Sequence, residues 1–151
     1  MSFFDAMSML SSGLVAEQTR MNTISDNIAN INTTQTPQGG PYQRAEAVFQ
    51  SIENTQFPFS PPTPPTPYPG GVQQPLSNGV EVISIYKDPT PGRLVYDPRN
   101  PLANTSGYVR YPNVDLVTEM SDMMSATRAY SANVTAINSL KTTANQALTI
   151  K

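Results

Sequence analysis

Three acidic residues at the start of the last third of the chain have the spacing most suited to chemistry. Asp115, Glu119 and Asp122 recur at helical intervals, so a helix places their carboxylates near one face. Carboxylate oxygens are the ligands that Mg²⁺ and Ca²⁺ prefer. The simpler interpretation is that the helix dipole favours acidic side chains at a helix N-terminus. We favour it because no base, nucleophile cluster or phosphate loop accompanies them. We therefore expect no metal site, no cofactor and no enzyme activity.

The residue composition excludes several other kinds of site. The chain has no Cys and no His, which removes thiol nucleophiles, disulfides, Cys/His zinc sites and an imidazole for proton transfer near neutral pH. The formal net charge of −2 comes without a basic cluster, so we expect no nucleic-acid binding. No run of about 18 apolar residues is present, which predicts no transmembrane segment. The N-terminus lacks the basic and apolar regions of a cleaved signal peptide, so export would use an uncleaved terminus.

The element that positions the acidic residues is a long C-terminal helix, expected from Pro112 to Lys151 with Asn113 as its N-cap. Apolar residues recur in alternating steps of four and three, a pattern typical of a seam buried against another helix. No Pro or Gly follows Pro112, so the helix can reach roughly 50 Å. The apolar seam positions are Leu116, Met120, Met123, Tyr130, Val134, Ile137, Ala144 and Leu148.

The same alternation occurs at the other end of the chain, where we expect a helix from about Phe4 to Ile31. Its apolar seam positions are Met7, Leu10, Leu14, Met21, Ile24, Ile28 and Ile31, interrupted by Glu17. Seams at both termini predict an antiparallel helical hairpin or coiled coil, with both chain ends at one end of a rod. The alternative is ordinary helix packing within a globular core.

The outer faces of these helices carry few charges. Only 13 % of the residues are charged, against about 25 % in a typical soluble protein. The C-terminal helix carries Ser, Thr, Ala and Asn where a solvated helix usually carries Glu and Lys pairs. We interpret this face as a surface that other subunits cover. The alternative is a small-residue helix that water covers.

Between the helices, the sequence predicts a small β-rich domain at residues 37–111, while residues 1–36 and 112–151 form a helical assembly domain. The expected strands are Tyr42–Ile52, Gly79–Lys87, Arg93–Tyr96 and Gly107–Tyr111, with the second and third forming a hairpin about the turn at Asp88–Gly92. The proline-rich loop at residues 57–75 disfavours helix and strand ladder alike. We interpret it as a surface loop, the alternative being a PxxP ligand. The expected fold class is α+β.

Several motifs in this chain resemble those of one family. Residues 26–34 (DNIANINTT) are similar to the Asn-rich motif shared by flagellar rod and hook proteins at the end of their first helix. The blocks LVYDP, NPLAN, GYV and PNVD between residues 94 and 115, and ATRAYSAN at 126–133, are more specific. Over nearly its whole length the chain resembles the bacterial flagellar basal-body rod proteins, most closely the C-type proteins of the proximal rod. The proline-rich run is longer than the loop expected there, and no family role is carried onto it.

The resemblance implies a structural role without catalysis. It implies that the terminal helices pair and pack beside neighbours in a helical tube, the proximal rod, which transmits motor torque to the hook. It also implies type III export to the rod in the periplasmic space. The implied partners are other rod proteins, copies of the chain, and base-ring and export-gate components at the proximal end. The alternative is a coiled-coil structural or translocon component of another type III secretion system.

The expected assembly interface combines seam and motif residues of both helices. Its members are Leu10, Leu14, Met21, Ile24, Asn27, Ile28, Asn30, Ile31, Asn32, Met120, Met123, Arg128, Tyr130, Asn133, Val134, Ile137 and Leu148. We expect assembly to be coupled to folding, because propensity alone does not stabilise long helices in water. The competing interpretation is that the same residues form the core of a single chain.

Overall fold

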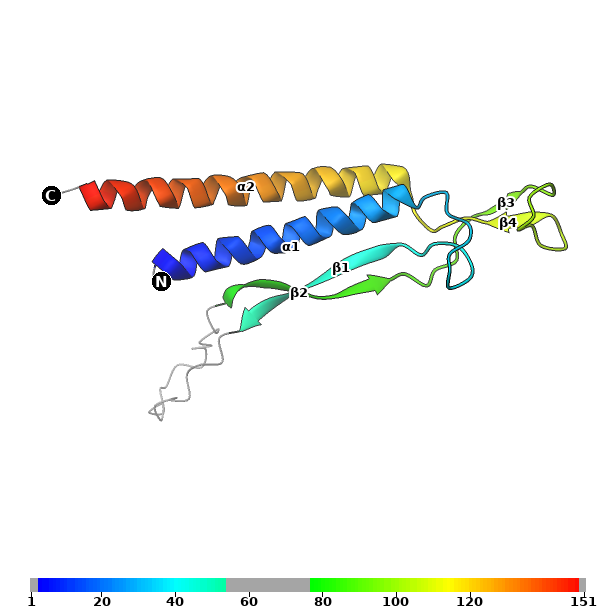
Figure 1. The fold of residues 1–151 in the computed structure, drawn as a ribbon, viewed down its shortest axis with the longest axis horizontal. Coiled ribbons are helices and arrows are strands. Elements are labelled where there is room, and N and C mark those ends of the chain that lie inside the picture. The colour runs from blue at the N-terminus through cyan, green and yellow to red at the C-terminus, as the bar shows by residue number, and fades with distance from the viewer. Residues whose placement is uncertain (1–2, 54–76, 150–151) are drawn as a thin grey trace, which may run out of the picture.

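The computed structural model describes residues 3–53 and 77–149 of the chain. The elements are α1 (Phe3–Ala29), β1 (Ala45–Glu53), β2 (Ser77–Lys87), β3 (Leu94–Tyr96), β4 (Tyr108–Arg110) and α2 (Leu116–Thr149). α1 lies between α2 on one side and the β1–β2 hairpin on the other, and the start of α1 and the end of α2 lie at the same end of the molecule (Figure 1). The α+β class with paired terminal helices is therefore confirmed. The proline-rich loop at residues 57–75 lies outside the described residues.

The two helices run antiparallel with small residues at a point of close approach. Thr127 Oγ1 lies 3.7 Å from Met21 Sδ, and a Cβ added at Gly13 would lie 3.0 Å from Asn133 Nδ2. Glycine inside a helix costs about 1 kcal/mol relative to alanine, so its benefit here is the room that it leaves for the neighbouring helix. None of the described helices is apolar enough over its length to cross a membrane.

Full burial within the helix pair is concentrated toward the end that joins the strands. The buried residues of the pair are Ala16, Thr23, Ile24 and Asn27 in α1, and Glu119 and Ala126 in α2. Beyond Ala126, none of the described α2 residues is fully buried. α2 has 34 residues against 27 in α1, and its last turns extend past the start of α1 (Figure 1). The chain by itself therefore covers much of α2 on one side only.

β1 and β2 form a two-stranded antiparallel sheet along α1. Its register runs from Ala45 opposite Lys87 to Glu53 opposite Ser77, with irregularities after Val48 and after Ser51. The Val80 amide donates a hydrogen bond to Ser12 Oγ at 3.1 Å, which ties β2 to α1. Gly79 has a φ of +136°, and a Cβ there would collide with Ser12.

The division into a helical domain and a middle domain stays a prediction.

The expected hairpin between Gly79–Lys87 and Arg93–Tyr96 is wrong. β2 pairs with β1, and β3 pairs instead with β4, placing Val95 opposite Val109. The reason is the path of the chain after Lys87: two prolines shape the turn, and Gly92 packs directly against the backbone of Tyr111 and Pro112. That contact starts the β3–β4 ladder, whose hydrogen bond from Tyr111 N to Arg93 O is 2.9 Å long.

The expected N-cap of the C-terminal helix is also wrong, because Asp115 caps α2 in place of Asn113. The Thr118 amide and hydroxyl donate to Asp115 Oδ2 at 3.2 and 2.7 Å, and these bonds lower the pKa of the Asp115 carboxyl below its usual value. Asn113 accepts from the Arg44 amide at 2.8 Å and donates to the Asp88 carbonyl at 3.3 Å. Its amide therefore joins the start of β1 to the turn after β2.

Candidate functional site

The three acidic residues at the start of α2 have three different roles. Asp115 is the exposed helix cap, Glu119 is 0 % exposed, and Asp122 lies beside two arginines. Within residues 3–53 and 77–149, no group of three Asp, Glu, His or Cys side chains could hold a metal ion. The interpretation of these residues as acids favoured by the helix dipole fits Asp115 but misses the pairing of the other two with arginines.

Glu119 forms the centre of an ionic junction that we define as Asn27, Arg44, Glu119 and Asp122. Arg44 Nε donates to Glu119 Oε1 at 2.6 Å, and Asn27 Nδ2 donates to Glu119 Oε2 at 3.0 Å. A second guanidinium nitrogen of Arg44 lies 3.4 Å from Asp122 Oδ2. The pKa of Arg44 is raised above its usual value, chiefly by the hydrogen bond to Glu119. A charge can be buried when it is paired and hydrogen-bonded in this way.

Asn27 uses both ends of its side-chain amide to fasten α1 to β1. It is 1 % exposed. Its Oδ1 accepts from the Ala45 amide at 2.9 Å, and its Nδ2 donates to the Ala45 carbonyl at 2.8 Å. Asn30, which directly follows α1, bonds locally, because its Nδ2 donates to the Asp26 carbonyl in the last turn of α1 at 2.9 Å. Asn27 instead bonds to Ala45 at the start of β1 and to Glu119 in α2, both distant from it in the sequence.

Further charges surround the junction and compensate one another. Arg20 lies 3.8 Å from Asp122 and 3.8 Å from Glu17, the residue that interrupts the apolar seam of α1. Arg44 also lies 3.6 Å from Glu46. Because these carboxylates and guanidinium groups are paired with each other, the junction acts as a structural connection between α1, β1 and α2.

Tyr42 closes one side of the junction, and its ionisation makes stability sensitive to alkaline pH. Its hydroxyl donates to Asn27 Oδ1 at 2.9 Å. Burial first, and then the carboxylates of Asp26 and Glu119, raise the pKa of Tyr42 above its ordinary value of 10.0. A raised folded-state pKa contributes stability that is fully present below the unfolded pKa and is lost as the pH rises through the folded pKa.

We therefore expect Tyr42→Phe to lower the free energy of unfolding at pH 7 by about 1 kcal/mol, the usual effect of one lost hydrogen bond. Because the variant lacks the ionising hydroxyl, its stability should fall less than that of the wild type above about pH 10. Urea unfolding at both pH values measures this difference. Tyr86→Phe, at an exposed position, is the control, and equal alkaline losses in Tyr42→Phe and the wild type would contradict the assignment.

The structure divides the expected interface residues into three sets, which are partly covered, fully buried or exposed. The side chains that the chain partly covers are Leu10, Leu14, Met21, Ile28, Asn30, Ile31, Met123, Tyr130, Asn133, Val134 and Ile137. Ile24 and Asn27 are fully buried within the chain itself. Asn32, Met120, Arg128 and Leu148 remain exposed, the last by 83 %. Much of the seam therefore packs within one chain, and whether it also contacts neighbours stays a prediction.

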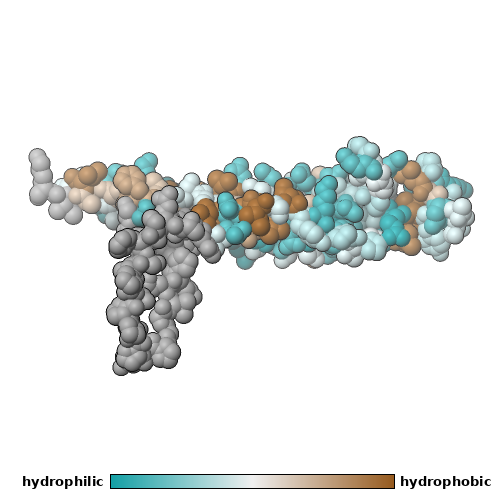
Figure 2. Space-filling model, turned by 90° about the horizontal axis from the view of Figure 1, so that it is seen from below, coloured by the Kyte–Doolittle hydropathy of each residue, from teal (hydrophilic) through white to brown (hydrophobic). Residues whose placement is uncertain are grey.

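Two exposed apolar faces were not expected from the sequence, although one of them includes Met120 of the expected interface. Val117, Met120 and Met124 are 75, 55 and 57 % exposed and follow one another at steps of three and four along α2, so they share one face. Ile83 and Ile85 are exposed on β2, and Figure 2 shows hydrophobic side chains gathered on the hairpin side of the molecule. The sequence does contain a second apolar stripe that begins at Val117. It was overlooked because the seam that begins at Leu116 runs beside it and shares Met120.

Comparison with known proteins extends over the whole chain. Residues 7–35 match the family described as "Flagella basal body rod protein", and residues 105–150 match "Flagellar basal body rod FlgEFG protein C-terminal". The chain is 44 % identical to the flagellar basal-body rod protein FlgC of Borreliella burgdorferi, with 99 % of this chain and 98 % of that protein aligned. It is 38 % identical to FlgC of Bacillus subtilis, with 99 % of each chain aligned.

The relative of the same name in Salmonella typhimurium is 35 % identical, with 99 % of this chain and 98 % of that protein aligned. These matches favour a rod protein over a needle or translocon component, and they confirm the resemblance seen in the motifs. Since the alignments cover both helices and both hairpins, the chain belongs to the family of flagellar basal-body rod proteins called FlgC.

Proposed function

We propose that this chain is a structural subunit of the proximal part of the flagellar rod and polymerises beside its own copies and other rod proteins. The observation that carries this proposal is the pair of apolar faces on opposite outer layers of an elongated molecule. One face lies on α2 at Val117, Met120 and Met124, and the other lies on β2 at Ile83 and Ile85. Exposed apolar stripes of this kind mark surfaces that a partner covers.

The layered arrangement supports open-ended assembly. α2 and the β1–β2 hairpin lie on opposite sides of α1 (Figure 1), so two different faces of one subunit are available to two different neighbours. Contacts between unlike faces generate a helical filament when the rotation between subunits does not close into a ring. The many contacts around such a tube would share the load when motor torque passes to the hook.

The proposal includes a place and a route for the subunit. We place it in the rod within the periplasmic space, reached through type III export without a cleaved signal peptide. Its further partners at the proximal end would be base-ring and export-gate components. We propose no catalytic role, because the charged groups of the ionic junction are paired with one another and its relatives bear the name of rod proteins.

Deletion of the gene and purification of basal bodies test the proposal together. We expect the deletion strain not to swim, and a tagged chain that restores swimming to be found in the rod by electron microscopy of purified basal bodies. Swimming at the wild-type level without the chain would contradict the proposal. Recovery of the tagged chain with a different secretion apparatus, and not with basal bodies, would favour the alternative function.

A further inference from the structure

The outer face of α2 carries two methionines that are neighbours on the helix surface. Met120 and Met124 are 55 and 57 % exposed, and side chains four residues apart on a helix lie next to each other. The chain has seven Met and no Cys, so every sulfur atom in it belongs to a methionine. Methionine sulfur is a common target of mild two-electron oxidants. The face that we propose as a contact surface is therefore also accessible to oxidation.

The remaining methionines among the described residues are less accessible. The sulfur of Met21 lies 3.7 Å from Thr127 Oγ1, at the contact between the two helices. Because the oxidation of a side-chain sulfur follows its exposure to solvent, we expect Met120 and Met124 to react first. The side chains that the chain partly covers are Met7, Met9, Met21 and Met123.

The reaction with hydrogen peroxide turns this apolar face into a polar one. The thioether sulfur attacks one peroxide oxygen, and an S–O bond forms as the O–O bond breaks. The second oxygen leaves as water after it takes up the proton of the first, so the sulfur loses two electrons and the peroxide gains them. The product, methionine sulfoxide, is a polar group in place of an apolar one. Two sulfoxides on adjacent turns of α2 would lie beside Val117 on the same face.

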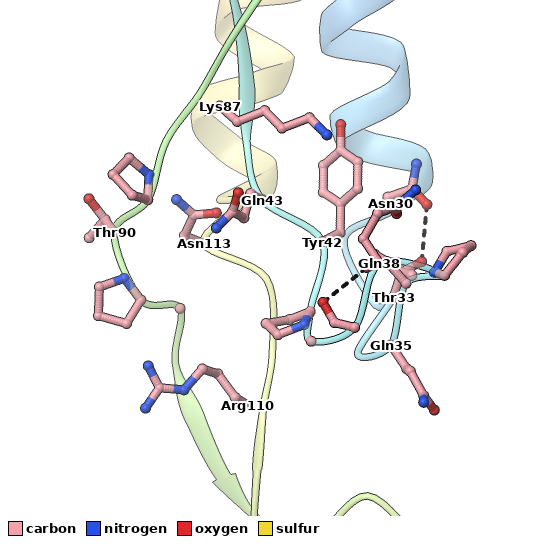
Figure 3. Close-up of a pocket in the computed structure, with 18 residues that line it drawn as sticks. Asn30, Thr33, Gln35, Gln38, Tyr42, Gln43, Lys87, Thr90, Arg110 and Asn113 are labelled. Atoms are coloured by element: carbon pink, nitrogen blue, oxygen red, sulfur yellow. Dashed lines mark hydrogen bonds between the residues drawn. The ribbon is translucent and has the colours of Figure 1, made fainter.

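The other open surfaces of the molecule offer peroxide no such target. A cleft of about 580 Å³ lies between the Asn-rich turn after α1 and the proline turn after β2. Among the described residues that line it, none carries sulfur, and amides, threonines, prolines and glycines surround Tyr42, Lys87 and Arg110 (Figure 3). The exposed apolar residues of β2, Ile83 and Ile85, also lack sulfur. Peroxide would therefore alter the α2 face and leave these two surfaces unchanged.

We propose that Met120 and Met124 are modification sites through which a peroxide-class oxidant keeps a free subunit out of the rod. On contact with an apolar neighbour the sulfoxides would lose their hydrogen bonds to water, and burial of a polar group without a partner is unfavourable. In an assembled rod the same contact would cover both sulfurs. The modification is reversible, because methionine sulfoxide reductases restore the thioether. The inference rests on the proposed rod function and adds a control of assembly to it.

Oxidation of the folded, full-length chain tests the first step. The purified chain is treated with hydrogen peroxide and digested, and mass spectrometry with fragmentation gives the rate of oxidation at each methionine. We expect Met120 and Met124 to oxidise at least about fivefold faster than Met21 and Met123. In concentrated urea, which unfolds the chain, the four rates should become nearly equal. Equal rates in the folded chain would overturn the inference.

Competition between subunits tests the second step. The Gln pair, Met120→Gln with Met124→Gln, carries polar side chains of similar size, whereas the matched Leu pair, Met120→Leu with Met124→Leu, stays apolar and has no sulfur at these positions. Each tagged variant is expressed together with the untagged wild type in flagellated cells. Relative to a tagged wild-type chain, we expect the share of the Gln pair in purified basal bodies to fall about tenfold and that of the Leu pair to stay unchanged. Both purified variants should unfold at the wild-type temperature, because the two positions are exposed on a helix.

Growth with a sublethal concentration of hydrogen peroxide tests the oxidant itself. In cells that express the tagged Leu pair and the untagged wild type together, we expect peroxide to raise the ratio of the Leu pair to the wild type in new rods at least about twofold. Both chains share the same cell and the same rods, so oxidation of other proteins affects them equally.

Equal incorporation of the Gln pair and the Leu pair, or a ratio that peroxide leaves unchanged, would contradict the proposed control. The tagged wild-type chain distinguishes the two proposals. If it is found in rods and either of these results is obtained, oxidation does not control assembly and the rod function stands. If the wild-type chain is absent from rods, both proposals fail.

Discussion

Replacing Arg44 with alanine is expected to lower the free energy of unfolding by about 3 kcal/mol, the lower end of the range for breaking a buried ion pair. The reason is that Glu119, with a fully buried side chain, would keep its charge and lose the guanidinium 2.6 Å away. Asn27 would remain as a hydrogen-bond donor to Glu119, but a neutral amide does not compensate a buried carboxylate. Urea unfolding of the purified chain, followed by circular dichroism, measures the change.

Two variants distinguish the loss of the buried pair from the loss of an ordinary surface charge. Glu46→Gln removes an exposed carboxylate 3.6 Å from the same arginine, and its effect should stay below about 1 kcal/mol. The double variant Arg44→Met with Glu119→Leu replaces the pair by apolar groups and should recover most of the stability. If Arg44→Ala destabilises no more than Glu46→Gln, the junction does not hold the helices and strand together in the way described.

Replacing Val117 and Met124 with aspartate is expected to abolish swimming without unfolding the subunit. Both side chains are more than half exposed on the outer face of α2, so in the isolated chain the charges would be solvated and stability should change by less than about 0.5 kcal/mol for each. In an assembled rod the same positions would place carboxylates against an apolar neighbour, which costs far more. Motility in soft agar and the amount of chain in purified basal bodies measure the outcome.

The matched control is Thr105→Asp, an exposed position in the turn between β3 and β4, which should leave swimming intact. Val134→Asp and Ile137→Asp provide the contrast, since these partly covered side chains belong to the expected seam. They should prevent assembly and also lower the stability of the isolated chain. Normal swimming with aspartate at both outer-face positions would show that this face does not contact a neighbour.

The sequence alone determined the elements and the class of this protein. Apolar residues at steps of three and four predict two long helices, because a helix turn takes about 3.6 residues and the pattern depends only on neighbours along the chain. The observed α1 (Phe3–Ala29) and β2 (Ser77–Lys87) begin and end within two residues of their expected bounds. The Asn-rich motif and the blocks between residues 94 and 133 also identified the family, since they are local sequence features.

Tertiary structure alone decided which of these elements meet and which charges pair. Arg44 and Glu119 are 75 positions apart in the sequence, and Asn27 reaches Ala45 and Glu119 from a third element. A periodic pattern reports which face of an element is apolar, but the partner of a buried charge depends on how several elements pack in three dimensions. The choice of β4 as the partner of β3, and the exposed face at Val117, arose in the same way, because both depend on the space that distant segments already occupy.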